Sequence, residues 1–385
     1  ILLAGKDLTG PCCVMLSDEC YIGSNHKQLL EFPYEEGLVT CSVMSADDTK
    51  MIQRNYSIIK DGIRAKRLIE KPQVLENNLL GLGTFILTPG FFPLLEEAFA
   101  QSKDDYVEFV TFINGLCGGQ PGVLCFEMKG TYVNINDRDS LNLARFYERK
   151  RTFDNNRISL LLYSEGVEQN IGFTINRYRR NPAIHSIHVV LPCDNVIADK
   201  VIASGAEIIL CPADVTLYGE KLCYALDRLP GDIFVLAEAE YTFPEHDINK
   251  LLEYLKEADM VVGTRTTRQL IEQGSDMQGV VRIANIALAK LIELLWWRRE
   301  MRISDVGCTF RAMWQNCYKD IRGRLHSRGP ELLAEIAVEL VADRKRLIEI
   351  PVNYYNRSKA MDKKYRNRRT FLSILRMLCR KRFKT

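Results

Sequence analysis

Short apolar runs alternate with polar or helix-like segments along most of this chain, and this alternation leaves few folds open. After residue 157 four such runs follow one another, at 158–163, 186–192, 207–211 and 232–237. Runs at 12–16 and 39–44 belong to an earlier series. Apolar runs separated by helices are typical of parallel strands that are covered on both faces. We therefore predict an α/β protein with mainly parallel sheets.

A polar stretch at 147–157, YERKRTFDNNR, separates the two series and carries six charged residues. The chain has 385 residues, which exceeds the usual length of a single domain. We predict two Rossmann-like domains, at 1–149 and 157–375, and a basic tail at 361–385. In such sheets ligands bind beyond the carboxyl ends of the strands, so the residues that follow each strand are the candidates for a site.

The composition excludes several classes of protein. Hydrophobic residues make up 46% and charged residues 26% of the chain, as in ordinary folded globular proteins. Lys290 and Glu293 interrupt the most apolar segment, so we expect no membrane-spanning helix. The 12 cysteines lack the spacing of metal ligands and fit reduced thiols in the cytoplasm. The first residue is Ile1 and no signal-peptide pattern follows, which favours a truncated start.

The positive charge of the chain is concentrated in its tail. Residues 361–385 hold ten Lys/Arg and one Asp, a sum of +9, whereas the whole chain has a net charge of +3 and the remainder therefore −6. Apolar residues recur there at helical spacing, at Phe371, Ile374, Leu375 and Leu378. This pattern fits a basic helix on an anionic membrane surface, and it equally fits a helix packed on the body with solvated cations. The acidic body has no recognition motif for nucleic acid, so we expect no such partner.

Three segments of the first domain place polar residues where strands are expected to end. They are Ser17-Asp18-Glu19, Glu70-Lys71-Pro72 and the segment at 130–136. A carboxylate at a strand end can hold Mg²⁺, and a lysine suits a sugar phosphate. Each residue also has a plainer interpretation, as a turn former or a solvated loop cation.

The order of these segments resembles the C-terminal two thirds of a sugar-phosphate nucleotidyltransferase. The resemblance implies that Asp18 and Asn134 bind the metal. It also implies that Glu70 and Lys71 meet the sugar phosphate beside a strand containing Gly83, with Lys71 taking part in catalysis. The family's glycine-rich phosphate loop has no counterpart in this sequence, so we expect the domain to bind nucleoside triphosphate very weakly.

In the second domain two carboxylates, Glu238 and Glu240, follow a buried apolar run. Carboxylates at this spacing can reach one divalent cation that bridges a diphosphate. They also fit an acidic loop ahead of a helix, where the helix dipole favours negative charge. Polar segments at 261–265, 305–311, 349–354 and 357–359 follow in order.

This ordered set resembles family 2 glycosyltransferases of the dolichol-phosphate mannosyltransferase-like branch, over residues 157–375. The resemblance implies a GT-A fold with Mg²⁺ or Mn²⁺ on Glu238 and Glu240. It places Asp305 near the reacting centre, with Arg311 as a second catalytic group. The remaining implied contacts are with phosphate: Arg265 and Arg311 on the donor, Arg357 and Lys359 on the acceptor.

Two positions depart from that pattern. The family's acidic pair after its second strand is reduced to Asp194, and its Asn-Glu pair after the first strand is reduced to Glu165. Both residues are expected to bind the donor. Glu240 stands where an Asp is usual, and its longer side chain would shift the metal-binding oxygen.

We therefore expect a fused transferase that moves a sugar from a nucleotide-sugar donor to a polyprenyl phosphate, at the cytoplasmic face of a membrane. Such an acceptor is already anionic, so positioning and charge neutralisation would supply most of the catalysis. A soluble or polysaccharide acceptor is the first alternative, and a degenerate nucleotide-sugar-binding protein is the second. The sequence leaves the oligomeric state open.

Overall fold

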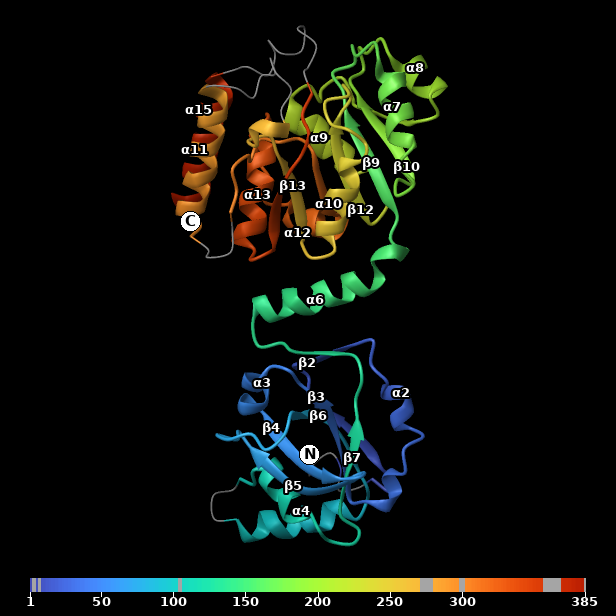
Figure 1. Ribbon diagram of the computed structural model, residues 1–385, viewed down its shortest axis with the longest axis vertical. Coiled ribbons are helices and arrows are strands. Elements are labelled where there is room, and N and C mark those ends of the chain that lie inside the picture. The colour runs from blue at the N-terminus through green and yellow to red at the C-terminus, as the bar shows by residue number, and fades with distance from the viewer. Residues whose placement is uncertain are drawn as a thin grey trace. The chain divides into compact units, whose positions relative to one another are not determined.

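The computed structural model describes residues 1, 5, 8–102, 106–270, 280–297, 302–355 and 368–383. The chain divides into two compact units, Ile1–Tyr147 and Glu148–Thr385 (Figure 1). The polar stretch at 147–157 is helical, because it forms the end of α6 (Arg138–Thr152) and the short helix η2 (Phe153–Asn155). Phe153 anchors η2 in the core of the second unit, where its ring lies 5.6 Å from that of Trp314.

The first unit contains a six-stranded sheet whose strands are mostly antiparallel. The strands are β1 (Cys12–Met15), β3 (Val39–Ser45), β4 (Tyr56–Asp61), β5 (Arg64–Glu70), β6 (Leu79–Leu87) and β7 (Val123–Glu127). They follow the order β1-β6-β3-β7-β5-β4, and β4 also pairs with β6, so five of them close into a barrel-like sheet. Among the described strands of this sheet the one parallel pair is β3 with β7.

The prediction of a mainly parallel, Rossmann-like sheet is therefore wrong for the first unit. The connection between β4 and β5 shows why, since it consists of Gly62 and Ile63 alone. Parallel neighbours need a crossover of a dozen residues or more, whereas two residues can join only antiparallel strands. Gly62 has a φ of 55°, which such a tight turn requires and which glycine adopts without strain.

A small second sheet and several short helices complete the first unit. The sheet pairs β2 (Glu19–Ile22) with β8 (Thr131–Asn134). Apolar side chains from β3, β6 and β7 form the core together with Phe91 and Phe92. The helices are α2 (His26–Leu29), η1 (Tyr34–Glu36), α3 (Thr49–Arg54), α4 (Phe91–Gln101) and α5 (Phe109–Gly115).

The second unit has the α/β architecture that the sequence predicts. Its strands are β9 (Ile158–Tyr163), β10 (Ser186–Leu191), β11 (Glu207–Leu210), β12 (Ile233–Glu238), β13 (Met260–Thr264), β14 (Arg311–Trp314) and β15 (Leu347–Pro351). They follow the order β11-β10-β9-β12-β14-β13-β15. The pairs are parallel except those of β14, which runs antiparallel to β12 and β13, so the sheet is mixed.

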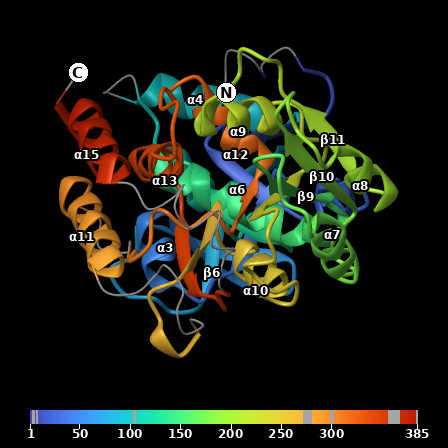
Figure 2. The same ribbon diagram turned by 90° about the horizontal axis from the view of Figure 1, so that it is seen from above.

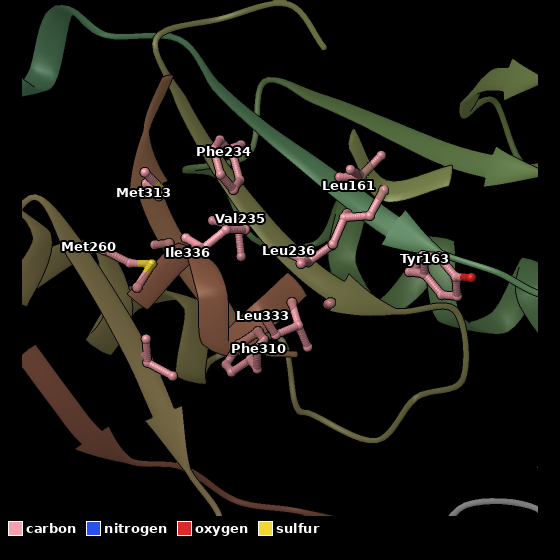
Figure 3. Close-up of a cluster of buried hydrophobic side chains, with 14 of the residues drawn as sticks. Leu161, Tyr163, Phe234, Val235, Leu236, Met260, Phe310, Met313, Leu333 and Ile336 are labelled. Atoms are coloured by element: carbon pink, nitrogen blue, oxygen red, sulfur yellow. The ribbon is translucent and has the colours of Figure 1, made fainter. Parts of the chain in front are cut away.

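The core of the second unit lies between this sheet and its helices. Figure 3 shows Leu161, Val235 and Leu236 of the central strands near Phe310 and Leu333. Burying one such side chain stabilises the fold by about 1.5–3 kcal/mol. The helices are α7 (Ile171–Arg179), α8 (Ala198–Ala203), α9 (Tyr218–Leu226), α10 (Asp247–Leu255), η3 (Arg268–Leu270), α11 (Val280–Leu295), α12 (Gln315–Arg322), α13 (Leu332–Ala342) and α15 (Arg368–Phe383).

Helix α15 forms the described part of the basic tail and packs on the body of the second unit. Ile374 and Leu378 are buried in the core, and Phe371 and Leu375 pack against it. These four apolar residues are the ones that could have faced a membrane. The body of the second unit covers them, so this face of α15 is a packed helix face. Within the described part of the chain, no helix has the length and apolar character needed to cross a membrane.

A lysine between two carboxylates fixes α15 to α13. The Lys381 Nζ lies 2.9 Å from a carboxylate oxygen of Glu335 and 2.6 Å from one of Glu339. Glu335 is fully buried and also accepts hydrogen bonds from the backbone N–H groups of His326 and Ser327. Burial alone would raise the pKa of Glu335, but Lys381 and the Ser327 hydrogen bonds lower it below the ordinary value. The carboxylate therefore stays ionised and holds the helix.

A matched pair of leucines tests the orientation of α15. Replacing buried Leu378 by Ala should lower the free energy of unfolding by about 2–5 kcal/mol, because a cavity forms against the core. Leu372→Ala, on the exposed side of the same helix, should change it by less than about 0.5 kcal/mol. Chemical denaturation followed by circular dichroism measures both. Equal effects of the two substitutions would contradict the orientation described here.

Candidate functional site

The strand order of the second unit reverses between β9 and β12, and the polar residues predicted from the sequence gather there. From β9 the chain proceeds outward to β10 and β11, then returns to the other side of β9 as β12. Glu238, at the end of β12, lies opposite Tyr163, at the end of β9. The Ala239 N–H donates to the Tyr163 carbonyl over 2.9 Å. Open α/β sheets bind ligands at such a reversal, beyond the carboxyl ends of the strands.

The loop after β9 is organised by a carboxylate that the sequence analysis missed. Glu168 is buried and accepts hydrogen bonds from the backbone N–H groups of Glu165, Gly166 and Val167, at 2.8, 3.1 and 3.1 Å. The Ser164 hydroxyl donates to the same carboxylate. These bonds fix the position of Glu165 relative to β12.

Glu165 forms an ion pair with Lys221 of α9, which the sequence analysis also missed. The Lys221 Nζ lies 3.0 Å from a carboxylate oxygen of Glu165, and the two side chains are 6% and 11% exposed. The ammonium group also lies 5.6 Å from the centre of the Tyr163 ring. Fifty-five residues separate the two partners in the sequence, so only the topology reveals the pair. A buried cation therefore lies beside the loop of the strand reversal.

The two predicted metal ligands differ in their surroundings. Glu238 is 7% exposed, and its carboxylate accepts hydrogen bonds from the hydroxyls of Thr242 and Thr309, at 3.2 and 3.1 Å. Glu240 is half-buried in the turn that follows β12, where its carbonyl accepts from the Thr242 N–H over 2.7 Å. Among the described residues, no cluster of three or more His, Cys, Asp or Glu could bind a metal.

Arg265 and Asp305, both predicted to serve the chemistry, form a buried ion pair with each other. The Arg265 Nε and Nη2 donate to the two Asp305 oxygens over 2.7 and 2.9 Å, and the Arg265 backbone N–H donates over 3.1 Å. Burial alone would lower the pKa of Arg265, but the charge and hydrogen bonds of Asp305 raise it well above its ordinary value. The pair positions the loop, and the roles predicted for these two residues, in phosphate binding and at the reacting centre, remain predictions.

Glu349 of β15 holds the same loop from the other side. Its carboxylate accepts hydrogen bonds from the backbone N–H groups of Ser304 and Asp305, both at 2.7 Å, and from the Ser304 hydroxyl at 2.8 Å. Burial raises the pKa of Glu349, although these hydrogen bonds partly offset the effect. The loop that leads to Thr309 and β14 is thus fixed between β13 and β15.

Arg311 also has a structural position, and the expectation that it contacts phosphate or takes part in catalysis remains a prediction. The side chain is fully buried at the start of β14. Its guanidinium donates to the carbonyls of Cys308 and Leu333, over 3.2 Å from Nε and 2.9 Å from Nη1. Burial lowers its pKa. The sequence shows that a cation stands in this motif. It does not show that the N–H groups of the guanidinium donate to backbone carbonyls.

Asp194 is exposed at the carboxyl end of β10, next to the Glu165 loop. The Val196 N–H, two residues further on, donates to the Gly166 carbonyl over 2.9 Å and joins the two loops. Asp194 and Glu165 therefore border one edge of the site. Arg357 and Lys359, predicted to meet the acceptor phosphate, lie outside the described residues.

An aromatic cluster borders Glu240 on the side of α7. The Tyr241 ring stacks on that of Tyr355 with 6.0 Å between centroids, and the Arg177 guanidinium lies 5.5 Å from its centre. Arg177 also pairs with Glu245 at 2.9 Å. Burial and the contact with Glu245 raise the pKa of Tyr241. The phenol therefore stays neutral.

In the first unit the structure brings together three of the predicted residues, Asp18, Gly83 and Asn134. Glu19 pairs with Asn134 across β2 and β8, and the Ile135 N–H donates to the Asp18 carbonyl over 2.6 Å. The Gly83 N–H donates to both Glu19 oxygens, at 2.9 and 2.8 Å. The sequence analysis missed Glu19, whose pKa is raised by burial and which also accepts from Tyr132 over 2.8 Å.

Glu70 and Lys71 lie at the end of β5 in the same unit. The Lys71 side chain is 68% exposed, and its Nζ lies 3.7 Å from Glu70. Its backbone has a φ of 42°, and its N–H donates to the Asn55 carbonyl over 2.7 Å. Tyr56 connects this end of β5 to the glycine strand, because it pairs with both Glu70 and Gly81. The roles assigned to Glu70 and Lys71 remain predictions.

The Arg265–Asp305 pair yields a stability test. Asp305→Asn leaves the Arg265 charge buried without its counter-charge and should lower the free energy of unfolding by about 3–5 kcal/mol. The double variant Arg265→Met with Asp305→Leu should recover part of this loss, since both charges are removed. Asp227→Asn, which breaks the more exposed pair with Arg322, is the control and should cost less than about 1 kcal/mol. Urea denaturation measures all three, and similar losses for Asp305→Asn and Asp227→Asn would refute the structural role.

No protein-family model matches the chain. Over 160 residues it is 24% identical to the low-salt glycan biosynthesis hexosyltransferase Agl6 of Haloferax volcanii. That match covers 41% of this chain and 37% of the relative, so the chain spans little more than a third of the length of this curated protein.

The solved structures that resemble the chain include glucosyl-3-phosphoglycerate synthase from Mycobacterium tuberculosis. Its complex with phosphoglyceric acid has a TM-score of 0.47 at 15% identity and covers 62% of this chain and 84% of that one. Its complex with Mn²⁺, uridine diphosphate and phosphoglyceric acid has a TM-score of 0.46 at 15% identity and covers 61% and 82%.

Proposed function

We propose that the second unit is a GT-A glycosyltransferase that transfers a sugar from a nucleotide-sugar donor to a polyprenyl phosphate. The observation that carries the proposal is the strand reversal, where Glu238 and Glu240 follow one strand and the Glu165–Lys221 pair lies beside the end of the neighbouring strand. Anionic and cationic groups thus converge where an α/β sheet binds its ligand. The sequence similarity to a hexosyltransferase supports the same class of reaction.

Glu240 is the residue we propose to hold the divalent metal, Mg²⁺ or Mn²⁺. Glu238 is already held by two threonine hydroxyls, whereas Glu240 lies in the half-buried turn beyond it. Mg²⁺ is usually bound through one or two carboxylates together with substrate phosphates and waters, so Glu240 with Glu238 beside it fits a diphosphate-bridged ion. A bound metal would neutralise charge on the departing nucleoside diphosphate.

The remaining groups of the reversal are assigned to the donor. Glu165 and Asp194 border the site where we propose that the nucleoside binds, and Lys221 supplies a fixed positive charge beneath it. Asp305, Arg265 and Arg311 are left out of the binding groups. They hold the loop that presents Thr309 to Glu238.

For the acceptor we propose a lipid phosphate at a membrane surface, with Arg357 and Lys359 contacting its phosphate. The phosphate is already an anion near neutral pH, so the nucleophile needs little help from a general base. That is consistent with a site in which the one aspartate expected at the reacting centre is ion-paired. A soluble or polysaccharide acceptor, and a binding protein without turnover, are the alternatives that the test below separates.

The direct test compares the wild type with Glu240→Gln. Purified protein is incubated with UDP-, GDP-, CDP- and dTDP-sugars and Mn²⁺, with and without polyprenyl phosphate, and nucleotide release is measured. We expect acceptor-dependent release that falls roughly a hundredfold in Glu240→Gln, because charge stabilisation of the leaving group is lost. Glu253→Gln, an exposed residue of α10, is the matched control and should retain full activity. No release from any donor by the folded wild type would refute the transferase.

For the first unit we propose that Asp18 and Asn134 bind a metal together with a sugar phosphate. The convergence of these residues on adjacent strands around Glu19 favours it. Titration calorimetry with a panel of sugar 1-phosphates and Mn²⁺ tests the proposal. Asp18→Ala should weaken Mn²⁺-dependent binding roughly tenfold, as loss of one ligand interaction commonly does. Asp61→Ala, an exposed residue of the β4–β5 hairpin, should leave it unchanged. Equal binding by wild type and Asp18→Ala would exclude this site.

A further inference from the structure

Helices α11 and α15 pack next to each other on the second unit, and both views show them together at its margin (Figures 1 and 2). Each helix has one buried side. In α11 this side includes Leu288, Ala289 and Ile292, and in α15 it includes Ile374, Met377 and Leu378. Both helices therefore keep a second side that the described residues leave exposed.

The exposed side of α11 is largely apolar. Exposed positions recur at 283, 287, 290, 294 and 297, which is the spacing of one helix face continued just beyond its end. Three of these positions carry large apolar side chains, Ile283, Leu294 and Trp297, which are 67%, 65% and 73% exposed. Exposed apolar residues are common singly, but a stripe of them on one helix indicates an interaction surface.

The exposed side of α15 combines apolar and cationic residues. Leu372 and Phe383 are 51% and 73% exposed, and Arg376, Arg380 and Arg382 are exposed between them. The helix contains no acidic residue, and the one acidic residue of α11, Glu293, pairs with Lys290 at 2.6 Å. We name the exposed apolar and cationic residues of the two helices the outer face: Ile283, Leu294, Trp297, Leu372, Arg376, Arg380, Arg382 and Phe383.

We propose that the outer face of α11 and α15 docks on an anionic lipid bilayer. The argument is charge complementarity, because apolar side chains that can enter the headgroup region alternate with arginines that can pair with lipid phosphates.

This surface differs from the one that the helical pattern of the tail suggested. Phe371, Ile374, Leu375 and Leu378 pack on the body and are not available to a membrane. Instead α11, which lies far away in the sequence, supplies Leu294, and the segment just after this helix supplies Trp297. The inference rests on the proposed function for its purpose, since a lipid-phosphate acceptor requires the enzyme at the bilayer, but its test is independent of turnover.

The experiment measures binding of the full chain to sedimented vesicles. One set contains phosphatidylcholine alone, and the other contains equal parts of phosphatidylcholine and phosphatidylglycerol. We expect binding to the anionic set, with a blue shift of tryptophan emission that Trp297→Phe reduces. The double variant Trp297→Ala with Phe383→Ala should bind at least about tenfold more weakly, because two large apolar side chains no longer enter the bilayer.

Two matched variants control for charge and for exposed apolar surface in general. Arg376→Gln with Arg382→Gln should weaken binding to the anionic set and reduce its salt dependence. Val196→Ala with Ile202→Ala removes two equally exposed apolar side chains on the opposite part of the sheet, near β10 and α8, and should bind as the wild type does. Thermal denaturation checks that each variant is folded.

Three results would overturn the proposal: no binding of the wild type to anionic vesicles, wild-type binding by the Trp297→Ala with Phe383→Ala variant, or a dimer in light scattering that this variant converts to monomer. The last result would make the outer face an interface between copies of the chain. Nucleotide release with detergent-solubilised polyprenyl phosphate, in the absence of vesicles, is measured on the same samples, and Glu240→Gln should bind vesicles normally. If the wild type releases nucleotide but does not bind anionic vesicles, only the docking surface is refuted. If it binds the vesicles but releases no nucleotide, only the transferase is refuted.

Discussion

The buried ion pair between Arg265 and Asp305 is the interaction on which the geometry of the second unit's site depends. It ties the carboxyl end of β13 to the loop that precedes β14, and Glu349 fixes the same loop to β15. This arrangement brings Thr309 to Glu238 at the end of β12. A charge pair of this kind contributes little net stability, because desolvation offsets most of the attraction. The pair instead selects a single conformation of the loop before β14.

The strands of the second unit could be predicted closely from the sequence. The apolar runs at 158–163, 186–192, 207–211 and 232–237 correspond to β9, β10, β11 and β12. The strands β9, β10 and β12 are buried on both faces and therefore leave a continuous apolar signal, whereas the edge strand β11 is partly exposed. The first unit shows the limit of that signal. An apolar run does not reveal whether the neighbouring strand is parallel or antiparallel to it. In the first unit the two-residue β4–β5 turn decides this direction, and the apolar pattern does not detect such a turn.

The candidate site was predicted less completely than the fold, and for a physical reason. Glu238, Glu240 and Glu165 follow strand ends, so an argument from strand ends finds them. Lys221 lies on a helix and meets Glu165 only after the sheet has formed. Arg311 shows a related limit: a sequence motif does not reveal that the guanidinium donates to the backbone carbonyls of Cys308 and Leu333. The same ambiguity applied to α15, whose periodicity indicates an apolar face without stating what covers it.

The position of β14 governs the order in which the second unit can assemble. β14 lies between β12 and β13, although it follows both in the chain. During synthesis the strands β9 to β12 can pair as soon as they are made, but β13 has no neighbour in that sheet until residues 311–314 arrive. β13 and β15 join the rest through this one antiparallel strand, so closing the sheet requires contacts between residues that are far apart in the sequence. High contact order of this kind slows folding, and the half-sheet would expose the edge of β12 to other chains while it waits.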